Sequence, residues 1–234
     1  MSEMFPLELK QVAVIRRGKR MIGPVDLVLN PQGPTIIIGP NGSGKTTLLR
    51  VMHGIERINA GQVTWAYDYP AKHAFVFQSP IMLRRSVAEN LAYPQRLAKI
   101  SETVIRKDVD HWLSRIGLSA LRDRSATRLS GGERQKLAIA RALVCKPEVL
   151  FLDEPCANLD GYATRDIEVL LQEAAETGTR LIMATHDMGQ ARRLAHDLVF
   201  MLDGKVHEAG PSAQAFITPK TNELAAFLRG DIVI

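Results

Sequence analysis

The chain has 234 residues and a formal net charge of +5, with 46% apolar and 24% charged residues. This composition is that of a soluble globular protein and excludes a disordered chain. No run of 18 apolar residues occurs, so we expect no transmembrane helix, and the first six residues lack the basic and apolar regions of a secretory signal. Cys145 and Cys156 form no CxxC or zinc pattern and fit a reducing cytosol. The positive charge is spread along the chain and by itself indicates no partner.

The first part of the chain has the pattern of strands. Alternating apolar residues predict strands at 7–12 and 25–29, and a β-branched run at 35–38 predicts a buried central strand. A glycine-rich turn and a helix at 45–53 follow, and further strands are expected at 62–67 and 73–77. From about residue 86 to 128 the pattern is helical and rich in polar residues, with a plausible cap at Ser101. This stretch predicts a helical lobe inserted between strands.

The last part returns to alternation. After a helix from about 129 to 144, strands are expected at 148–152, 180–184, 197–202 and 205–208, and helices at 162–176, 188–195 and 213–228. Asp203-Gly204 indicates a type I′ hairpin between the last two strands. Strands that alternate with helices predict an α/β fold with a mainly parallel sheet covered on both faces. We expect residues 1–234 to form a single domain that includes the lobe.

A glycine-rich segment, Gly39-Pro-Asn-Gly-Ser-Gly44-Lys45-Thr46, matches the pattern G-x-x-x-x-G-K-[ST] in full. Its glycines allow a tight turn in which successive N–H groups converge on phosphate oxygens, and the following helix presents its positive end. Lys45 adds a charge for the β- and γ-phosphates, and the Thr46 hydroxyl can ligate Mg²⁺. The segment therefore predicts nucleotide binding. The residues expected at the nucleotide are Gly39, Pro40, Asn41, Gly42, Ser43, Gly44, Lys45, Thr46 and Thr47.

Two adjacent carboxylates, Asp153 and Glu154, lie at the end of an apolar predicted strand. In a phosphate-loop ATPase the first would hold Mg²⁺, and the second would point elsewhere and could polarise the attacking water. Such a pair is also common on protein surfaces. Its occurrence together with the phosphate loop favours the catalytic interpretation, because two buried acids are costly without a nearby cation.

A second candidate phosphate site begins the helix after the lobe. Ser130 and Glu133 have the spacing of a capping box, which is one reason for their presence. Gly131 and Gly132 weaken the first helical turn, yet they leave backbone N–H groups accessible to a ligand. One nucleotide could therefore be bound by two helix ends.

Taken in order, these segments resemble the ABC-type ATPases. The resemblance covers about residues 7–208 and rests on GPNGSGKT, Gln78, LSGGERQKLAIARAL, VLFLDEP, the run from Ala157 to Asp160, and Thr185-His186-Asp187. It implies a P-loop NTPase fold with an N-terminal antiparallel β-subdomain and an inserted helical subdomain. It also implies a homodimer in which two copies pack head to tail, so that the segment at Ser130 of one copy closes on the ATP held by the other.

The resemblance assigns roles to single residues. Glu154 is implied to be the general base, Gln78 to sense the γ-phosphate and Mg²⁺, and His186 to contact the γ-phosphate and hold the attacking water. The implied catalytic set is Lys45, Gln78, Glu154 and His186, the metal set is Thr46, Gln78 and Asp153, and the signature contacts are Ser130, Gly131, Gly132 and Glu133. The residues 158–160 are implied to communicate across the dimer.

Two residues depart from the family pattern. Arg16 occupies a position where an aromatic residue usually stacks on adenine, so either the guanidinium plane stacks there or base stacking is weak. Cys156 follows Glu154-Pro155 where threonine or serine is usual, and we expect little effect on the chemistry.

The function implied is that of an ATPase, peripheral on the inner, cytoplasmic face of the cell membrane, that powers solute import through a separate integral membrane permease. An extracytoplasmic solute-binding protein is expected in the same system, and nucleic acid is not. FQSPIMLRRSVAENL and the run 189–195 look similar to tungstate and other oxyanion importers. Within the first of these segments, Ile81, Met82 and Leu83 would form an exposed apolar patch that receives a short permease helix, unless they simply pack inside the lobe.

Other functions compete with this interpretation. An ATPase of an exporter or a lipoprotein-release system has the same motifs. Soluble ABC proteins of DNA repair or translation carry long coiled-coil insertions or two cassettes, neither of which occurs in this sequence. A phosphate-loop switch or kinase that binds nucleotide as a monomer has no need of LSGGE.

Overall fold

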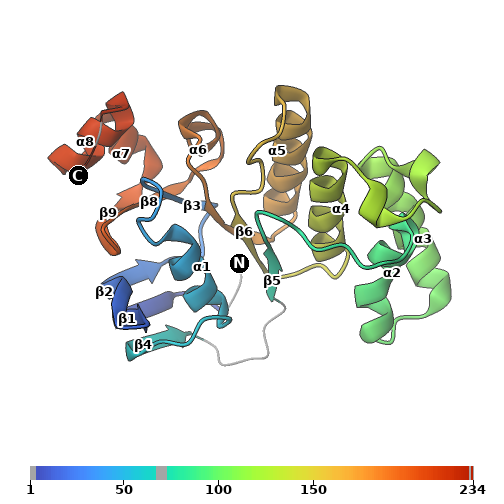
Figure 1. The fold of residues 1–234 in the computed structure, drawn as a ribbon, viewed down its shortest axis with the longest axis horizontal. Helices are drawn as coiled ribbons and strands as arrows, with labels where there is room; N and C mark the ends of the chain where they lie inside the picture. The colour runs from blue at the N-terminus through green and yellow to red at the C-terminus, as the bar shows by residue number, and fades with distance from the viewer. Residues whose placement is uncertain (1–3, 67–72, 232, 234) are drawn as a thin grey trace.

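The computed structural model describes residues 4–66, 73–231 and 233. Figure 1 shows a sheet with helices on both sides, an antiparallel sheet next to α1, and a lobe formed by α2 and α3 at the opposite end. The strands are β1 (Leu7–Arg16), β2 (Lys19–Leu29), β3 (Thr35–Ile38), β4 (Ala60–Trp65), β5 (His73–Val76), β6 (Val149–Asp153), β7 (Arg180–Ala184), β8 (Asp197–Leu202) and β9 (Lys205–Pro211). The helices are α1 (Lys45–His53), α2 (Val87–Leu97), α3 (Glu102–Arg115), α4 (Gly131–Leu143), α5 (Gly161–Glu176), α6 (Met188–Leu194), α7 (Ser212–Ile217) and α8 (Asn222–Arg229).

The central sheet has six strands in the order β5-β6-β7-β3-β8-β9, and every neighbouring pair except β8 with β9 is parallel. Successive side chains of a strand point to opposite faces. Accordingly, Leu150 and Leu152 of β6 pack toward α4, α5 and α6, whereas Val149 and Phe151 pack toward α1 and the antiparallel sheet. Because both faces are buried, these strands are apolar throughout. The predicted α/β fold with a mainly parallel sheet is confirmed.

The antiparallel subdomain is a three-stranded sheet in the order β2-β1-β4. Strand β1 runs to Arg16, farther than the predicted end at residue 12, because an irregularity at Gln11 interrupts the alternation without ending the strand. Gln11 has a φ of 49°, and its N–H donates at 2.8 Å to the side-chain Oδ1 of Asp26 on the neighbouring strand β2. Strand β4 begins two residues earlier than predicted, and the predicted end at Tyr67 lies outside the described residues.

The inserted lobe contains α2 and α3, followed by a short 3-10 turn at Ala126–Arg128 that leads into α4. Ser86 caps α2, since its Oγ accepts the N–H of Glu89 at 3.2 Å. Ser101 lies at the predicted N-terminus of α3 but forms no side-chain cap hydrogen bond. Apolar residues of both helices join the core on the α4 side of the central sheet, so the lobe packs continuously with that core.

The C-terminal region differs from the prediction of one helix at 213–228. It forms α7 and α8, separated at residues 218–221. Pro219 lies in this gap, and proline disfavours both helical backbone before it and a helix through it. Thr221 caps the new helix, and its N–H and hydroxyl both donate to Glu208, which anchors the break. Among the described residues, no helix is both long and apolar enough to cross a membrane.

Candidate active site

The chain segments that carry the predicted chemistry leave the central sheet at one edge. The phosphate loop follows β3, Gln78 follows β5, Glu154 follows β6 and His186 follows β7. The carboxyl ends of parallel strands meet at the same edge, which is where open α/β sheets bind ligands. Strand β7 lies between β3 and β6, so it separates the phosphate loop from the acidic strand by the width of one strand.

The phosphate loop ends in a left-handed glycine that begins α1. Gly44 has a φ of 99°, and a Cβ there would lie 2.5 Å from Ile22 Cγ2, so both conformation and space require glycine. Lys45 turns back over the loop, and its Nζ donates to Gly39 O at 2.9 Å and to Pro40 O at 3.0 Å. Burial lowers the pKa of Lys45, and the nearby Glu154 and Asp153 carboxylates offset part of this effect. An anion over the loop would compensate the buried charge.

Thr46 and Asp153 bring two oxygen donors together. Thr46 Oγ1 donates to Asp153 Oδ1 at 2.8 Å, although the two residues are far apart in the chain. Asp153 is buried, and burial raises the pKa of its carboxyl group above the ordinary value. Mg²⁺ is typically bound by one or two carboxylates together with substrate phosphates and water. A hydroxyl and a buried carboxylate beside a phosphate loop therefore fit Mg²⁺. The described residues contain no group of three or more His, Cys, Asp or Glu side chains that could hold a metal ion by themselves.

Glu154 is held between two other predicted catalytic residues. Its Oε2 accepts the Nε2–H of Gln78 at 3.2 Å and lies 3.1 Å from Nδ1 of His186. The backbone of Glu154 is left-handed, with a φ of 46°, and its N–H donates to Ala184 O at 2.9 Å. The backbone thus turns away from the direction of β6 at Glu154, while its hydrogen bond to Ala184 keeps this residue beside β7. A carboxylate fixed in this way can receive a proton from a water molecule.

These side chains surround one open cavity of about 480 Å³. It is lined by Met21, Asn41, Gly42, Gly44, Lys45, Thr46, Thr47, Gln78, Glu154, Ala157, Asn158 and His186. Met21 had no signal in the sequence, because the β1–β2 hairpin brings it to the phosphate loop from a distant part of the chain. The cavity thus combines the phosphate loop with the implied base and γ-phosphate contacts.

The second predicted phosphate site lies outside this cavity. Ser130 begins α4 with a complete capping box, in which its Oγ accepts the Glu133 N–H at 3.3 Å and its own N–H donates to Glu133 Oε2 at 2.7 Å. Ser130 and Gly131 are exposed, and a Cβ on Gly131 would meet nothing within 4 Å. Within one copy, the structure therefore does not bring Ser130, Gly131, Gly132 and Glu133 to the nucleotide cavity.

Comparison with known proteins agrees with this arrangement. The model of the family described as ABC transporter matches residues 22–157. The tungstate uptake ATP-binding protein TupC of Peptoclostridium acidaminophilum is 41% identical over 180 residues, which covers 75% of this chain and 84% of that protein. The phosphate import ATP-binding protein PstB of Thermotoga maritima is 37% identical, with coverage of 85% of this chain and 87% of the relative. The chain belongs to the ABC transporter family.

A solved structure adds the oligomeric form of one such protein. An ATP-binding cassette bound to ADP and Pi, solved as a dimer in a post-hydrolysis state, has a TM-score of 0.78 and 26% identity to this chain. The match covers 88% of this chain and 98% of the other. The predictions of an ABC-type ATPase and of ATP as its ligand are thereby confirmed, since family and fold agree with the phosphate-loop geometry.

The departure at Arg16 acquires a structural context in this ABC ATPase. Both Nε and Nη2 of Arg16 bond to the carboxylate of Glu56, with Nε at 3.2 Å from Oε1. This pair occupies one edge of the planar guanidinium and fixes its orientation. Arg16 lies at the end of β1 and is not part of the cavity lining. We propose that the guanidinium plane of Arg16 stacks on the base of the nucleotide, and that its hydrogen bonds to Glu56 hold the plane in the orientation for this contact.

We expect Arg16→Ala to raise KM for ATP by about two- to fivefold with kcat unchanged, because stacking of an exposed guanidinium on a π-face contributes about 0.5–1 kcal/mol and stabilises substrate and transition state equally. Steady-state ATPase kinetics measure both constants. Lys10→Ala removes a positive charge from the same strand and is expected to leave KM unchanged. An unchanged KM for the Arg16 variant would mean that the base is not bound through this residue.

The expected apolar patch after Gln78 is only partly correct. Ile81 is 80% exposed, but Met82 is only 9% exposed and joins the core on the α4 side of the sheet. Asn90 of α2 turns the segment inward, because its Oδ1 accepts the Leu83 N–H at 3.0 Å. Met82 is therefore a packing residue, and substituting it would test stability more than a partner contact.

Proposed function

We propose that two copies of this chain bind two ATP molecules between them and power the import of a solute through a separate membrane permease. The observation that carries this proposal is the division of the phosphate-binding residues. Lys45, Thr46 and Glu154 line the cavity of one copy, while Ser130 lies exposed on another part of the same copy. A second copy placed head to tail would supply the missing helix end. The closed dimer would bind ATP more tightly than ADP, because the contact made by Ser130 requires the γ-phosphate.

The catalytic roles follow from the contacts. Glu154 Oε2 would take the proton of the attacking water. Gln78 and His186 contact this carboxylate oxygen from two sides and would hold it in place. Lys45 would stabilise the charge that develops on the transferred phosphoryl group. When bound, Mg²⁺ neutralises phosphate charge, and Thr46, Asp153 and Gln78 are the residues that would hold it.

The substrate proposed is an oxyanion, with tungstate as the first candidate. Two relatives of this chain are named for oxyanions, one for tungstate and the other for phosphate. The translocation path belongs to the permease, so the ATPase itself carries no binding site for the solute in this proposal. The system would include an extracytoplasmic protein that delivers the anion. The chain would bind the permease from the inner face of the membrane.

The permease contact proposed is the surface around Ile81. A cavity of about 400 Å³ lies between this segment and the lobe and is lined largely by apolar residues, including Phe77, Leu83 and Tyr93. Arg141 of α4 crosses to this surface, where its Nη2 donates to Ile81 O at 2.9 Å and its Nη1 to Asn90 Oδ1 at 3.1 Å. A short permease helix bound there would therefore contact the segment at Ile81. Through Arg141 this segment is hydrogen-bonded to α4, the helix that Ser130 caps.

Ile81→Asp tests this surface without disturbing the core. We expect the variant to lose permease-stimulated ATPase activity and anion transport by more than about tenfold, because a charge buried in an apolar interface is strongly unfavourable. The basal ATPase rate of the isolated chain is expected to remain within about twofold of wild type. Ile217→Asp is a matched control, since Ile217 is 79% exposed on α7, in a different part of the fold. Equal transport by both variants would place the contact elsewhere.

Reconstitution tests the function as a whole. The chain is co-expressed with a candidate permease and a candidate anion-binding protein from the same organism, purified through the permease, and placed in vesicles. We expect ATP-dependent accumulation of tungstate that requires the binding protein. Outward transport, or the absence of this chain from the complex purified through the permease, would contradict the proposal.

A further inference from the structure

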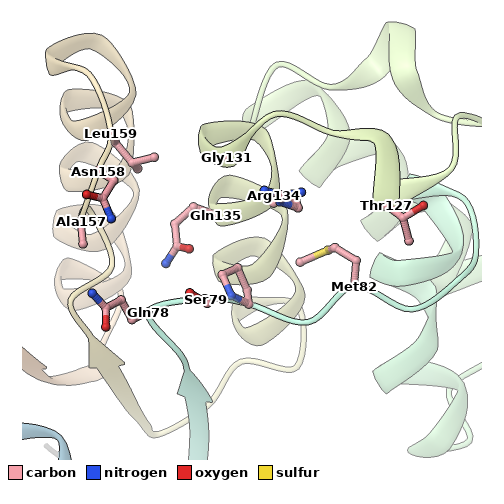
Figure 2. A pocket seen from close by; sticks show the side chains of 11 residues that line it. Gln78, Ser79, Met82, Thr127, Gly131, Arg134, Gln135, Ala157, Asn158 and Leu159 are labelled. Carbon is pink, nitrogen blue, oxygen red and sulfur yellow. The ribbon is translucent and has the colours of Figure 1, made fainter.

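Two short turns carry the contact between Glu154 and His186. The first follows β6 and leads into α5 through Ala157 and Asn158, which line the nucleotide cavity. Figure 2 shows these two residues on the segment that enters α5. The second turn follows β7 and leads at Asp187 into α6. The 3.1 Å contact between Glu154 and His186 therefore depends in part on how α5 and α6 lie relative to each other.

Helix α6 needs an anchor beyond its own hydrogen bonds. It has seven residues, and an isolated helix of that length is unstable in water. Ala191 and Leu194 are buried in the core, but apolar contacts are non-directional and do not fix the rotation of a helix. Asp187 caps the first turn, since its Oδ1 accepts the Gln190 N–H at 2.9 Å. Because Asp187 directly follows His186, a rotation of α6 would move the backbone of the histidine.

A buried carboxylate joins α6 to α5. Arg193 of α6 donates from Nε to Glu168 Oε2 at 2.8 Å and from Nη2 to Glu168 Oε1 at 2.7 Å. The side chain of Glu168 is only 6% exposed, so this carboxylate requires the guanidinium as its counter-charge. Two parallel hydrogen bonds define distance and angle together. The pair thus fixes the two helices in one relative orientation.

The same guanidinium lies close to the residue after His186. A Cβ on Gly189 would meet Arg193 Nη1 at 3.0 Å and Asp187 Oδ1 at 3.1 Å, so glycine leaves room for Arg193 to reach back along the first turn of α6. Hydrogen bonding to Glu168 raises the pKa of Arg193, and the charge of Asp187 adds to this effect. Arg193 therefore interacts with α5 and with the start of α6.

We propose that Arg193 and Glu168 are positioning residues for His186. Their ion pair holds α6 against α5 and thereby holds His186 beside the Glu154 carboxylate. Neither residue is among those that line the nucleotide cavity in the described part of the chain, so the pair acts through the two helices. This inference rests on the proposed function, since it concerns the orientation of groups around the proposed catalytic base.

Replacing both members with apolar residues separates positioning from stability. Removing one partner would leave a charge unpaired, whereas a well-packed apolar pair is often neutral or stabilising. We expect Glu168→Leu/Arg193→Met to keep the Tm of the wild type. Its kcat is expected to fall by about tenfold, as for one lost hydrogen bond, while KM for ATP stays within about twofold. A wild-type kcat would overturn the proposal, and so would a loss of kcat that is accompanied by a matching loss of Tm.

The matched control is another ion pair of α5. Arg115 of α3 donates from Nε to Glu173 Oε2 at 3.1 Å, so this pair also joins α5 to a neighbouring helix. Both residues line a different cavity, next to the segment that enters β6. Arg115→Met/Glu173→Leu is expected to leave kcat within about twofold of wild type. An equal loss of kcat in the two double variants would mean that any disturbance of α5 slows turnover, and would overturn the specific role of Arg193.

Arg193→Lys provides a test that keeps the buried carboxylate paired. Lysine retains the positive charge but cannot form two parallel hydrogen bonds. We expect kcat to fall by about threefold with KM and Tm unchanged, because the helices remain joined without a fixed angle. If the apolar double variant does not fold, this variant decides the question, and a wild-type kcat would then overturn the proposal.

A mutant cycle identifies the group that is positioned. In a His186→Ala background, Glu168→Leu/Arg193→Met is expected to change the single-turnover rate by less than about twofold, whereas in a Gln78→Ala background it keeps its full effect. Coupling to Gln78 instead of His186 would contradict the assignment.

The proposed function and the positioning role can fail separately. If the wild-type chain neither hydrolyses ATP nor dimerises with it, the proposed function fails. If the wild type does both and the variants of Arg193 and Glu168 match it in kcat, only the positioning role fails.

Discussion

Glu154→Gln is expected to reduce ATP turnover by about 10²- to 10⁴-fold, the contribution of a positioned general base. Glutamine keeps the shape of the side chain and can still contact Gln78 and His186, but it cannot take a proton from water. ATP would then remain bound, and the closed dimer would accumulate. We expect the variant to elute from a sizing column as a dimer with MgATP and as a monomer with MgADP.

Asp153→Asn is the contrasting control for this result. Its neighbour Thr46 donates to Oδ1 at 2.8 Å, so the substitution is aimed at the cation and not at the base. This variant is expected to lose turnover without forming the stable dimer, because MgATP binds weakly. A Glu154→Gln variant with wild-type turnover would remove Glu154 from the role of base, whatever its oligomeric state.

Ser130→Arg is expected to abolish ATP hydrolysis while a single chain still binds MgATP with near wild-type affinity. The reason is spatial: the phosphate loop of the same copy is complete without Ser130, and only the partner's nucleotide would meet the new side chain. Fluorescent-nucleotide titration measures binding, and phosphate release measures turnover. Substantial hydrolysis by this variant would argue against a site shared between two copies.

The substitution also removes the cap of α4, which costs about 1 kcal/mol. Ser86→Arg is the matched control, since Ser86 caps α2 in the same way, with its Oγ 3.2 Å from the Glu89 N–H. Both variants are expected to lose similar stability, but only the Ser130 variant is expected to lose hydrolysis. Equal loss of activity would mean that a damaged lobe, and not the nucleotide contact, explains the effect.

Local signals predicted the elements that form the reaction centre. The β-branched run Thr35–Ile38 and the strand Arg180–Ala184 were predicted with their observed bounds. The bounds of helix α1 were also predicted correctly, because Gly44 and Gly54 mark its two ends with left-handed backbone. The run Val149–Asp153 was displaced by only one residue. These segments are buried or tightly turned, so local sequence and tertiary structure favour the same conformation.

Contacts between distant segments were beyond prediction from residue patterns. No pattern indicates that β7 lies between β3 and β6, and thus no pattern sets the distance from Thr46 to Asp153. The contrast between Ile81 and Met82 has the same origin, because packing under α2 decides which of two neighbouring apolar residues is covered. The ion pair of Arg16 with Glu56 joins residues that have no common motif. The resemblance to a family implied the roles of single residues, but only the fold shows which residues contact one another.

Helix α4 spans Gly131–Leu143 and touches the lobe helix α2 on one side and α5 on the other. Its length is about 20 Å at 1.5 Å per residue, so it would act as a lever if its C-terminal end, near the start of β6, stayed in place. A tilt of about 5° would displace its far end by roughly 1.7 Å, which exceeds the range over which a hydrogen bond persists. In the proposed dimer, a small displacement at the outer surface would thus be enough to make or break the contact between Ser130 and the partner's phosphate.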